Sequence, residues 1–144
     1  MVCAFFGHRQ VLSSIETECR QQIEKVVKEN EAILFYIGHQ GQFDSMIKRI
    51  LRSLKTSYPH MEYAVVLAYM PSAACSKENE FLLGETLFPE GLEKVPPKYA
   101  IYKRNLWMIE QADMIITHVV HSVGGAWKFK KIAERKGKKI INIT

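Results

Sequence analysis

Apolar runs alternate with amphipathic stretches along all 144 residues, and this alternation restricts the possible folds more than any other feature. The apolar runs predict strands at 2–6, 33–37, 62–69, 114–119 and 139–143. Apolar residues at helical spacing predict helices at 13–30, 43–54 and 99–112, and one that begins near residue 125. Ser13 and Ser14 are expected to cap the first helix. We therefore predict an α/β, Rossmann-like fold: a doubly wound parallel sheet of five strands, order 3-2-1-4-5, with helices on both faces.

One segment, 70–98, breaks this alternation. Four prolines and Gly91 interrupt it, so its pattern leaves at most a short helix near 79–83. Loops of this length in compact domains are usually functional or disordered, and the apolar side chains in this one predict a packed flap. The chain has the length of one ordinary domain, and we predict a single domain over 1–144.

Composition assigns the chain to the globular class, with 47% hydrophobic and 24% charged residues. No apolar run approaches the ~18 residues that span a bilayer, and the apolar N-terminus is too short for a secretory signal. Cys3, Cys19 and Cys75 are widely spaced, which suits reduced thiols and neither a disulfide framework nor a zinc site. We expect a cytoplasmic protein with no membrane partner.

Three glycine-containing loops follow predicted strands: 7–9 after the first, 38–41 after the second and 122–126 after the fourth. In a doubly wound sheet of the predicted order, the loops after strands 1 and 4 flank the crevice where ligands bind. Glycine permits close approach of the backbone, and N–H groups at the start of a helix attract anions. These loops therefore predict a site for a phosphate or a carboxylate.

Longer segments that include these loops resemble a known family. The segments are Gly7 to Arg9, Phe35 to Asp44, Arg104 to Met108, Ala112-Asp113 and Gly124 to Ala126. Together they are similar to the SLOG superfamily, which includes the DNA-processing protein DprA and the LOG phosphoribohydrolases. The resemblance covers nearly the whole chain and is greatest to a small, single-domain bacterial branch of unassigned function. It implies a domain that binds a nucleotide or a nucleotide-derived ligand.

The resemblance breaks at the residues that carry catalysis in LOG enzymes. Arg104 matches their catalytic arginine, but Lys131 stands where their catalytic glutamate would be. Trp127 and Lys128 replace a glycine and a threonine of their glycine motif. An ammonium group opposes the positive charge that develops during N-glycosidic cleavage. We therefore predict no catalytic residue and favour a non-catalytic sensor or binding protein. A hydrolase that takes its base from another residue is the alternative.

The predicted ligand-binding residues lie in the three loops, at the start of a following helix and on the helix before the fourth strand. They are Gly7, His8, Arg9, Gly38, His39, Gly41, Asp44, Arg104, Ser122, Gly124, Gly125 and Ala126. The two guanidinium groups are expected to bind phosphate; the alternatives are an ion pair for Arg9 and a surface position for Arg104. Asp44 would bind a ribose hydroxyl or only complement the helix dipole. No metal site or cofactor is predicted.

The last helix is strongly basic, with seven Lys or Arg residues between positions 128 and 139 against the single acid Glu134. Apolar residues at helical spacing place these charges on an outer, solvated face. A role as an accessory DNA-binding protein is the less favoured alternative, because no base-reading motif accompanies the charges. The expected partner is a nucleotide-like small molecule, and a homo-oligomer is left open.

Overall fold

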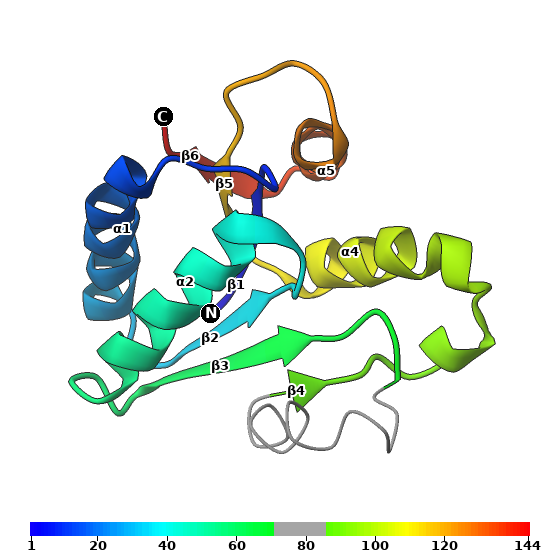
Figure 1. Cartoon of the computed structure of the whole chain (residues 1–144). Coiled ribbons are helices and arrows are strands. Elements are labelled where there is room, and N and C mark those ends of the chain that lie inside the picture. Colours follow the sequence, from blue (N-terminus) through cyan, green and yellow to red (C-terminus); the bar gives the residue numbers. More distant parts are fainter. Residues whose placement is uncertain (71–85) are drawn as a thin grey trace.

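The computed structural model describes residues 1–70 and 86–144, and a single parallel sheet forms its centre (Figure 1). Its six strands follow the order β4-β3-β2-β1-β5-β6. They are β1 (Val2–Gly7), β2 (Ile33–Ile37), β3 (Met61–Val66), β4 (Thr86–Leu87), β5 (Met114–His118) and β6 (Lys139–Asn142). Every neighbouring pair is parallel, so the strands all end at the same edge of the sheet, which we call the carboxyl edge.

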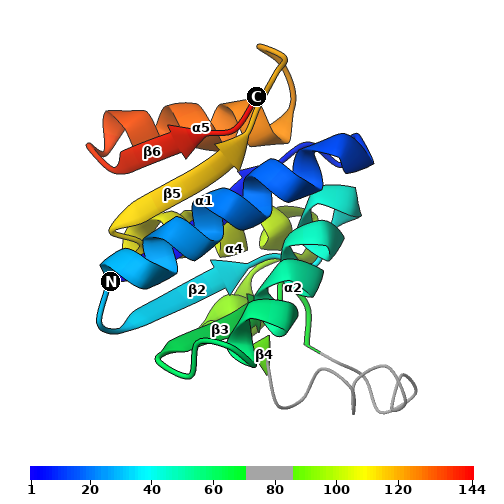
Figure 2. The same ribbon diagram turned by 90° about the vertical axis from the view of Figure 1, so that its left-hand side faces the viewer.

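Four helices of the described segments cover the two faces of the sheet. On one face lie α1 (Glu16–Glu29) and α2 (Gly41–Lys55), which stand in front of the sheet in Figure 2. On the other lie α4 (Ala100–Gln111) and α5 (Gly125–Arg135). Short 3-10 turns are formed by Ser13–Ile15, Leu92–Lys94 and Pro97–Tyr99. None of the helices in these segments is both long and apolar enough to cross a bilayer.

A hydrophobic core lies on each face of the sheet, and the two cores meet at the strand β1. Its side chains alternate, so that Phe5 packs in the core under α1 and α2 whereas Phe6 packs in the core under α4 and α5. Phe5 stacks on Phe35 of β2, and Phe6 stacks on Phe129 of α5, each with ring centres 5.6 Å apart. Burial on both sides keeps β1 in the middle of the sheet, and this places its carboxyl end at the centre of the carboxyl edge.

The prediction of five strands in the order 3-2-1-4-5 is wrong, because the sheet has a sixth strand. β4 contains only Thr86 and Leu87, too few residues to show an alternating pattern, and it lies in the segment predicted to be irregular. It extends the sheet beyond β3, where Val65 and Val66 pair with it. The N–H of Leu67 also donates a hydrogen bond to the carbonyl oxygen of Leu87 at 2.8 Å. β3, β2, β1, β5 and β6 follow one another in the rest of the sheet.

Two local predictions also differ from the structure. The serine caps are wrong: α1 begins at Glu16 after the turn Ser13–Ile15, and neither element has a side-chain cap. Of the flap predicted at 70–98, the structure describes residue 70 and residues 86–98. The second part forms β4 and two 3-10 turns, and its Leu92 is buried. The helix expected near 79–83 and Cys75 lie outside the described residues.

Candidate functional site

The register of the strands brings two of the glycine loops together. Gly7 at the end of β1 pairs with His118 at the end of β5, so the loops that follow leave the carboxyl edge side by side. A pocket of about 340 Å³ opens there, and we call it the carboxyl-edge pocket. The expectation that the two loops flank one pocket is confirmed. The predicted ligand-binding residues that line it are Gly7, His8, Arg9, Gly38, Asp44, Arg104, Gly124, Gly125 and Ala126.

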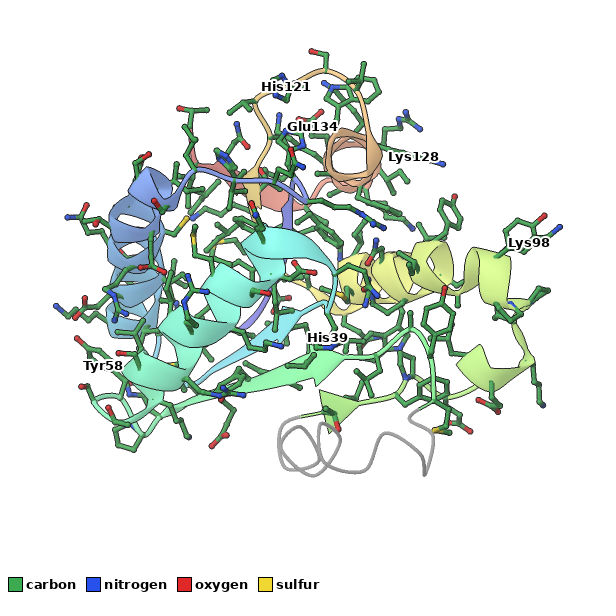
Figure 3. The ribbon with its side chains drawn as sticks, viewed as in Figure 1. His39, Tyr58, Lys98, His121, Lys128 and Glu134 are labelled. Carbon is green, nitrogen blue, oxygen red and sulfur yellow. The ribbon has the colours of Figure 1, made fainter. Side chains whose placement is uncertain are left out.

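Three predicted residues do not line this pocket. His39 lies with its Nδ1 atom 3.1 Å from Nζ of Lys48, and Figure 3 shows it well away from the loop that carries His121. Ser122 is exposed within that loop. Gly41 has a φ of +84°, and an added Cβ there would lie 2.8 Å from Cα of Arg9. Gly41 is therefore required where the loops after β1 and β2 pack against each other.

Two glycines of the pocket are required by neighbouring side chains. A Cβ on Gly7 would lie 2.2 Å from Cγ of Phe43, because the ring of Phe43 packs directly against the end of β1. A Cβ on Gly38 would lie 2.9 Å from Oδ2 of Asp44 and 3.2 Å from Cζ of Arg104. Gly38 therefore lets a carboxyl and a guanidinium group approach the same point of the backbone from two different helices.

Arg104 is a buried residue of the pocket, only 2% exposed, so the alternative of a surface position is wrong. Its Nε donates to Oδ1 of Asn105 at 2.7 Å, its Nη1 to the carbonyl oxygen of Val66 at 2.9 Å, and its Nη2 to Oε1 of Gln40 at 3.1 Å. Burial lowers the pKa of Arg104, and the charge of Asp44 raises it. The side chain thus joins α4, the end of β3 and the β2–α2 loop at the base of the pocket.

Asp44 supplies a carboxyl group with an unusual pKa to the same pocket. Burial raises its pKa to about 6, against the opposing effects of a hydrogen bond from Gln40 and the positive charges of Arg104, Lys48 and Arg9. The bond from the Gln40 N–H to Oδ2 measures 2.9 Å. Near pH 6 the carboxyl is therefore divided between an ionised form that only accepts hydrogen bonds and a protonated form that also donates one.

The start of α5 forms the opposite wall. Gly124 is its N-cap, with φ 94° and ψ 178°, a conformation open essentially to glycine alone. Its carbonyl oxygen accepts the first helical bond, from the N–H of Lys128. The N–H groups of the first turn have no acceptor within their own helix, and they carry the positive end of the helix dipole. Arg9 lies exposed beside this wall and, within the described residues, forms no ion pair. The arrangement favours an anion.

Gln40 and Asn105 are polar residues of the pocket that the sequence did not indicate. Both accept hydrogen bonds from Arg104, and the backbone of Gln40 also bonds to Asp44. Both lie in segments that carry the family resemblance, at 35–44 and 104–108, but the sequence assigned neither a role, and the packing of α4 against the β2–α2 loop reveals their contacts. They orient the two charged side chains at the base of the pocket.

The basic residues of α5 lie outside the pocket. Figure 3 shows Lys128 pointing away from the sheet, and its Nζ lies 4.7 Å from the ring centre of Tyr102. Lys130 and Lys131 contact Glu134 at 3.3 and 3.2 Å. The single acid of this helix therefore neutralises part of its outer face.

Comparisons with protein-family models and with curated proteins found no match to this chain, so its resemblance to the SLOG superfamily stays a prediction.

Proposed function

We propose that the carboxyl-edge pocket binds a nucleotide or a nucleotide-derived phosphate compound, and that the protein serves as a sensor or binding protein for it. The observation that carries the proposal is the presence, in one pocket, of an anion-attracting wall and a polar base. The wall consists of the α5 N-terminus and Arg9, and the base of Arg104 and Asp44. Ligand pockets typically combine a few such polar groups with apolar walls, which Ile101 and Phe129 provide here.

Each part of the pocket has a role in this proposal. A phosphate would accept hydrogen bonds from the first N–H groups of α5, and Arg9 would neutralise its charge. The hydroxyl groups of an attached sugar would bind Asp44, which accepts a hydrogen bond in either protonation state. The buried charge of Arg104 would favour the ionised form of Asp44 and attract the ligand.

Thermal unfolding with candidate ligands tests this proposal. A ligand present at one hundred times its Kd stabilises the folded state by about 2.7 kcal/mol, which raises the Tm of a chain of this size by about 5–10 °C. We expect such an increase with a nucleoside monophosphate or ADP-ribose, and none with the unphosphorylated nucleoside. A screen in which no phosphate compound stabilises the intact fold would contradict the proposal.

Gly125→Val is the matched variant for this experiment. Apart from its chain neighbours and the backbone of its own helix, no described atom lies within 4 Å of a Cβ added at Gly125, so the variant is expected to keep the Tm of the parent protein. The added side chain would stand over the first N–H groups of α5 and remove the ligand-dependent increase in Tm. An undiminished increase would show that the ligand binds elsewhere.

A second candidate function, N-glycosidic hydrolysis, is favoured by the carboxyl of Asp44 beside Arg104. Asp44 would accept the proton of an attacking water while the C1′–N bond breaks. The nucleobase would then leave with the electrons of the C1′–N bond and take a proton from solvent. In this reaction Asp44 would supply the catalytic carboxylate that Lys131, at the position of the LOG glutamate, cannot supply.

Release of free base from nucleoside monophosphates measures this activity. If the hydrolase is correct, Asp44→Asn is expected to reduce the rate by about 10²- to 10⁴-fold, the usual contribution of a general base. Arg104→Ala is the weaker test, because it also removes three hydrogen bonds, two of them buried. Ligand binding without any release of base would leave the binding protein as the function.

A further inference from the structure

Three histidines meet at the carboxyl edge, and the proposed ligand contacts do not use them. His8 follows β1, His118 ends β5, and His121 lies in the β5–α5 loop of residues 119–124, where Figure 3 labels it. The ring centre of His8 is 5.2 Å from that of His121 and 6.1 Å from that of His118. His8 also lines the carboxyl-edge pocket. The cluster therefore joins the pocket to the loop that precedes α5.

Hydrogen bonds indicate which ring nitrogens carry a proton in two of these histidines. The N–H of Val120 donates to Nε2 of His8 at 3.0 Å, and an amide N–H can only donate. Nε2 of His8 must then carry a lone pair, so the ring is neutral with its proton on Nδ1. Nδ1 of His118 lies 2.8 Å from the carbonyl oxygen of Ile143, which can only accept, so that nitrogen carries a proton.

The surroundings of His8 favour this neutral form. Its pKa is lowered by burial first, and then by the charges of His121 and His118. Arg9 follows it in the chain, and Arg104 lines the same pocket from α4. The negatively charged group of the pocket, Asp44 from α2, is itself close to half-protonated near pH 6. Positive groups therefore predominate around the ring.

The bond to His8 is an important contact of the β5–α5 loop. The start of the loop is held separately, because the side chain of Asn142 bonds to both the N–H and the carbonyl oxygen of Val119, at 2.9 and 3.1 Å. Beyond it, Val120 and Val123 are 51% and 71% exposed, so the loop gains little from burial. The loop then leads to Gly124, the N-cap of α5.

We propose that His8 is a positioning residue that holds the β5–α5 loop in place for anion binding only while its imidazole ring is neutral. The inference rests on the proposed function of the pocket and adds pH control to it. On protonation, Nε2–H of His8 would face the N–H of Val120, two donors in opposition, and the bond would be lost. The first N–H groups of α5 would then be less well ordered, and a ligand would have to restore that order when it binds.

An NMR titration of the ¹⁵N-labelled protein between pH 5 and 8 tests whether the hydrogen bond between His8 and Val120 depends on the protonation of His8. We expect the ring nitrogens of His8 to titrate with a pKa below 6.5, and the Val120 amide signal to change with the same midpoint. His121→Gln is expected to raise this shared midpoint, because it removes the neighbouring charge that lowers the pKa of His8 most. A Val120 signal that does not follow the titration of His8 would overturn the inference.

Three variants distinguish the effect of a hydrogen-bond acceptor for the Val120 N–H from the effect of the titrating imidazole ring of His8. His8→Gln places an amide oxygen near the position of Nε2, so we expect the Val120 amide to stay protected from hydrogen exchange at every pH. His8→Ala removes the acceptor and is expected to lose this protection throughout. His60→Gln is the matched control, because Nε2 of His60 bonds to the carbonyl oxygen of Val27 and not to the loop. It should leave the midpoint for Val120 unchanged.

Binding of inorganic sulfate gives the second readout, because its charge is constant over this pH range. In an Asp44→Asn background, which removes the other titrating group of the pocket, we expect affinity to fall about fivefold between pH 7.5 and 5.5. This corresponds to the loss of one hydrogen bond. His8→Gln in the same background should abolish the decrease. Stronger sulfate binding at low pH would overturn the inference but not the proposed function. No sulfate binding at any pH would contradict the proposed function, and a Val120 signal that still follows His8 would then show that His8 holds the loop but has no role in anion binding.

Discussion

Replacing Gly7 with alanine is expected to lower the free energy of unfolding by about 3 kcal/mol, as overpacking of a buried site does. The new Cβ would lie 2.2 Å from Cγ of Phe43, whose side chain is completely buried. Because protein interiors are close-packed, the ring has no empty space to move into. For a chain of this length the Tm should fall by about 6–12 °C, measured by circular dichroism.

Gly125→Ala is the control for this prediction, because it makes the same change on the opposite wall of the pocket. Apart from its chain neighbours and the backbone of its own helix, no described atom lies within 4 Å of its added Cβ, so stability should stay within about 0.5 kcal/mol of the parent protein. Urea unfolding of both variants in parallel measures the contrast. Equal stability would mean that Phe43 does not pack against the end of β1.

Asp44→Asn is expected to stabilise the protein by up to about 3 kcal/mol at pH 8 and to have no such effect at pH 4. Folding raises the pKa of Asp44 from 3.8 to about 6, so it favours the protonated carboxyl. That contribution is complete below pH 3.8 and is lost as the pH rises through about 6, where the ionised form becomes costly. The difference in pKa corresponds to the stated free energy. Urea unfolding at the two pH values measures it.

Glu110→Gln is a control of opposite sign. The pKa of Glu110 is lowered by its hydrogen bond with Lys136, so its ionised form stabilises the folded protein at high pH. Its replacement should therefore lower stability at pH 8 relative to pH 4. If Asp44→Asn behaved in the same way, the ionised carboxyl of Asp44 would be a net stabilising partner of Arg104. A pocket residue that costs stability at neutral pH is typical of a binding site.

The sequence predicted the parallel sheet, and it placed the loops after β1 and β5 beside each other. Both results follow from patterns that extend over whole elements, such as the buried strand from Met114 to His118. β4 was missed because two residues carry no periodicity. Its position depends on pairing with β3, which local sequence does not encode.

The roles of individual glycines were harder to predict. Gly7 and Gly41 have the sequence context of ligand-binding glycines, but Phe43 and Arg9 are what require them. Gly124 and Gly125 have open space above them, and at Gly125, where no positive φ requires glycine, a ligand would use the space of the missing side chain. A motif reports that a backbone position must be free of a side chain. It does not report whether protein or ligand fills the space.

The pairing of Gly7 with His118 also has a consequence for the order in which the protein is assembled. The two sides of the pocket come from opposite ends of the chain: Val120 bonds to a residue 112 positions before it. A nascent chain that has formed β1, β2 and β3 contains Arg9 but still lacks the α5 N-terminus of the anion-attracting wall. The edge of β1 that pairs with β5 is then still unpaired. A ligand of this pocket would therefore recognise only chains whose synthesis has passed α5, and it would favour completed molecules over partly made ones.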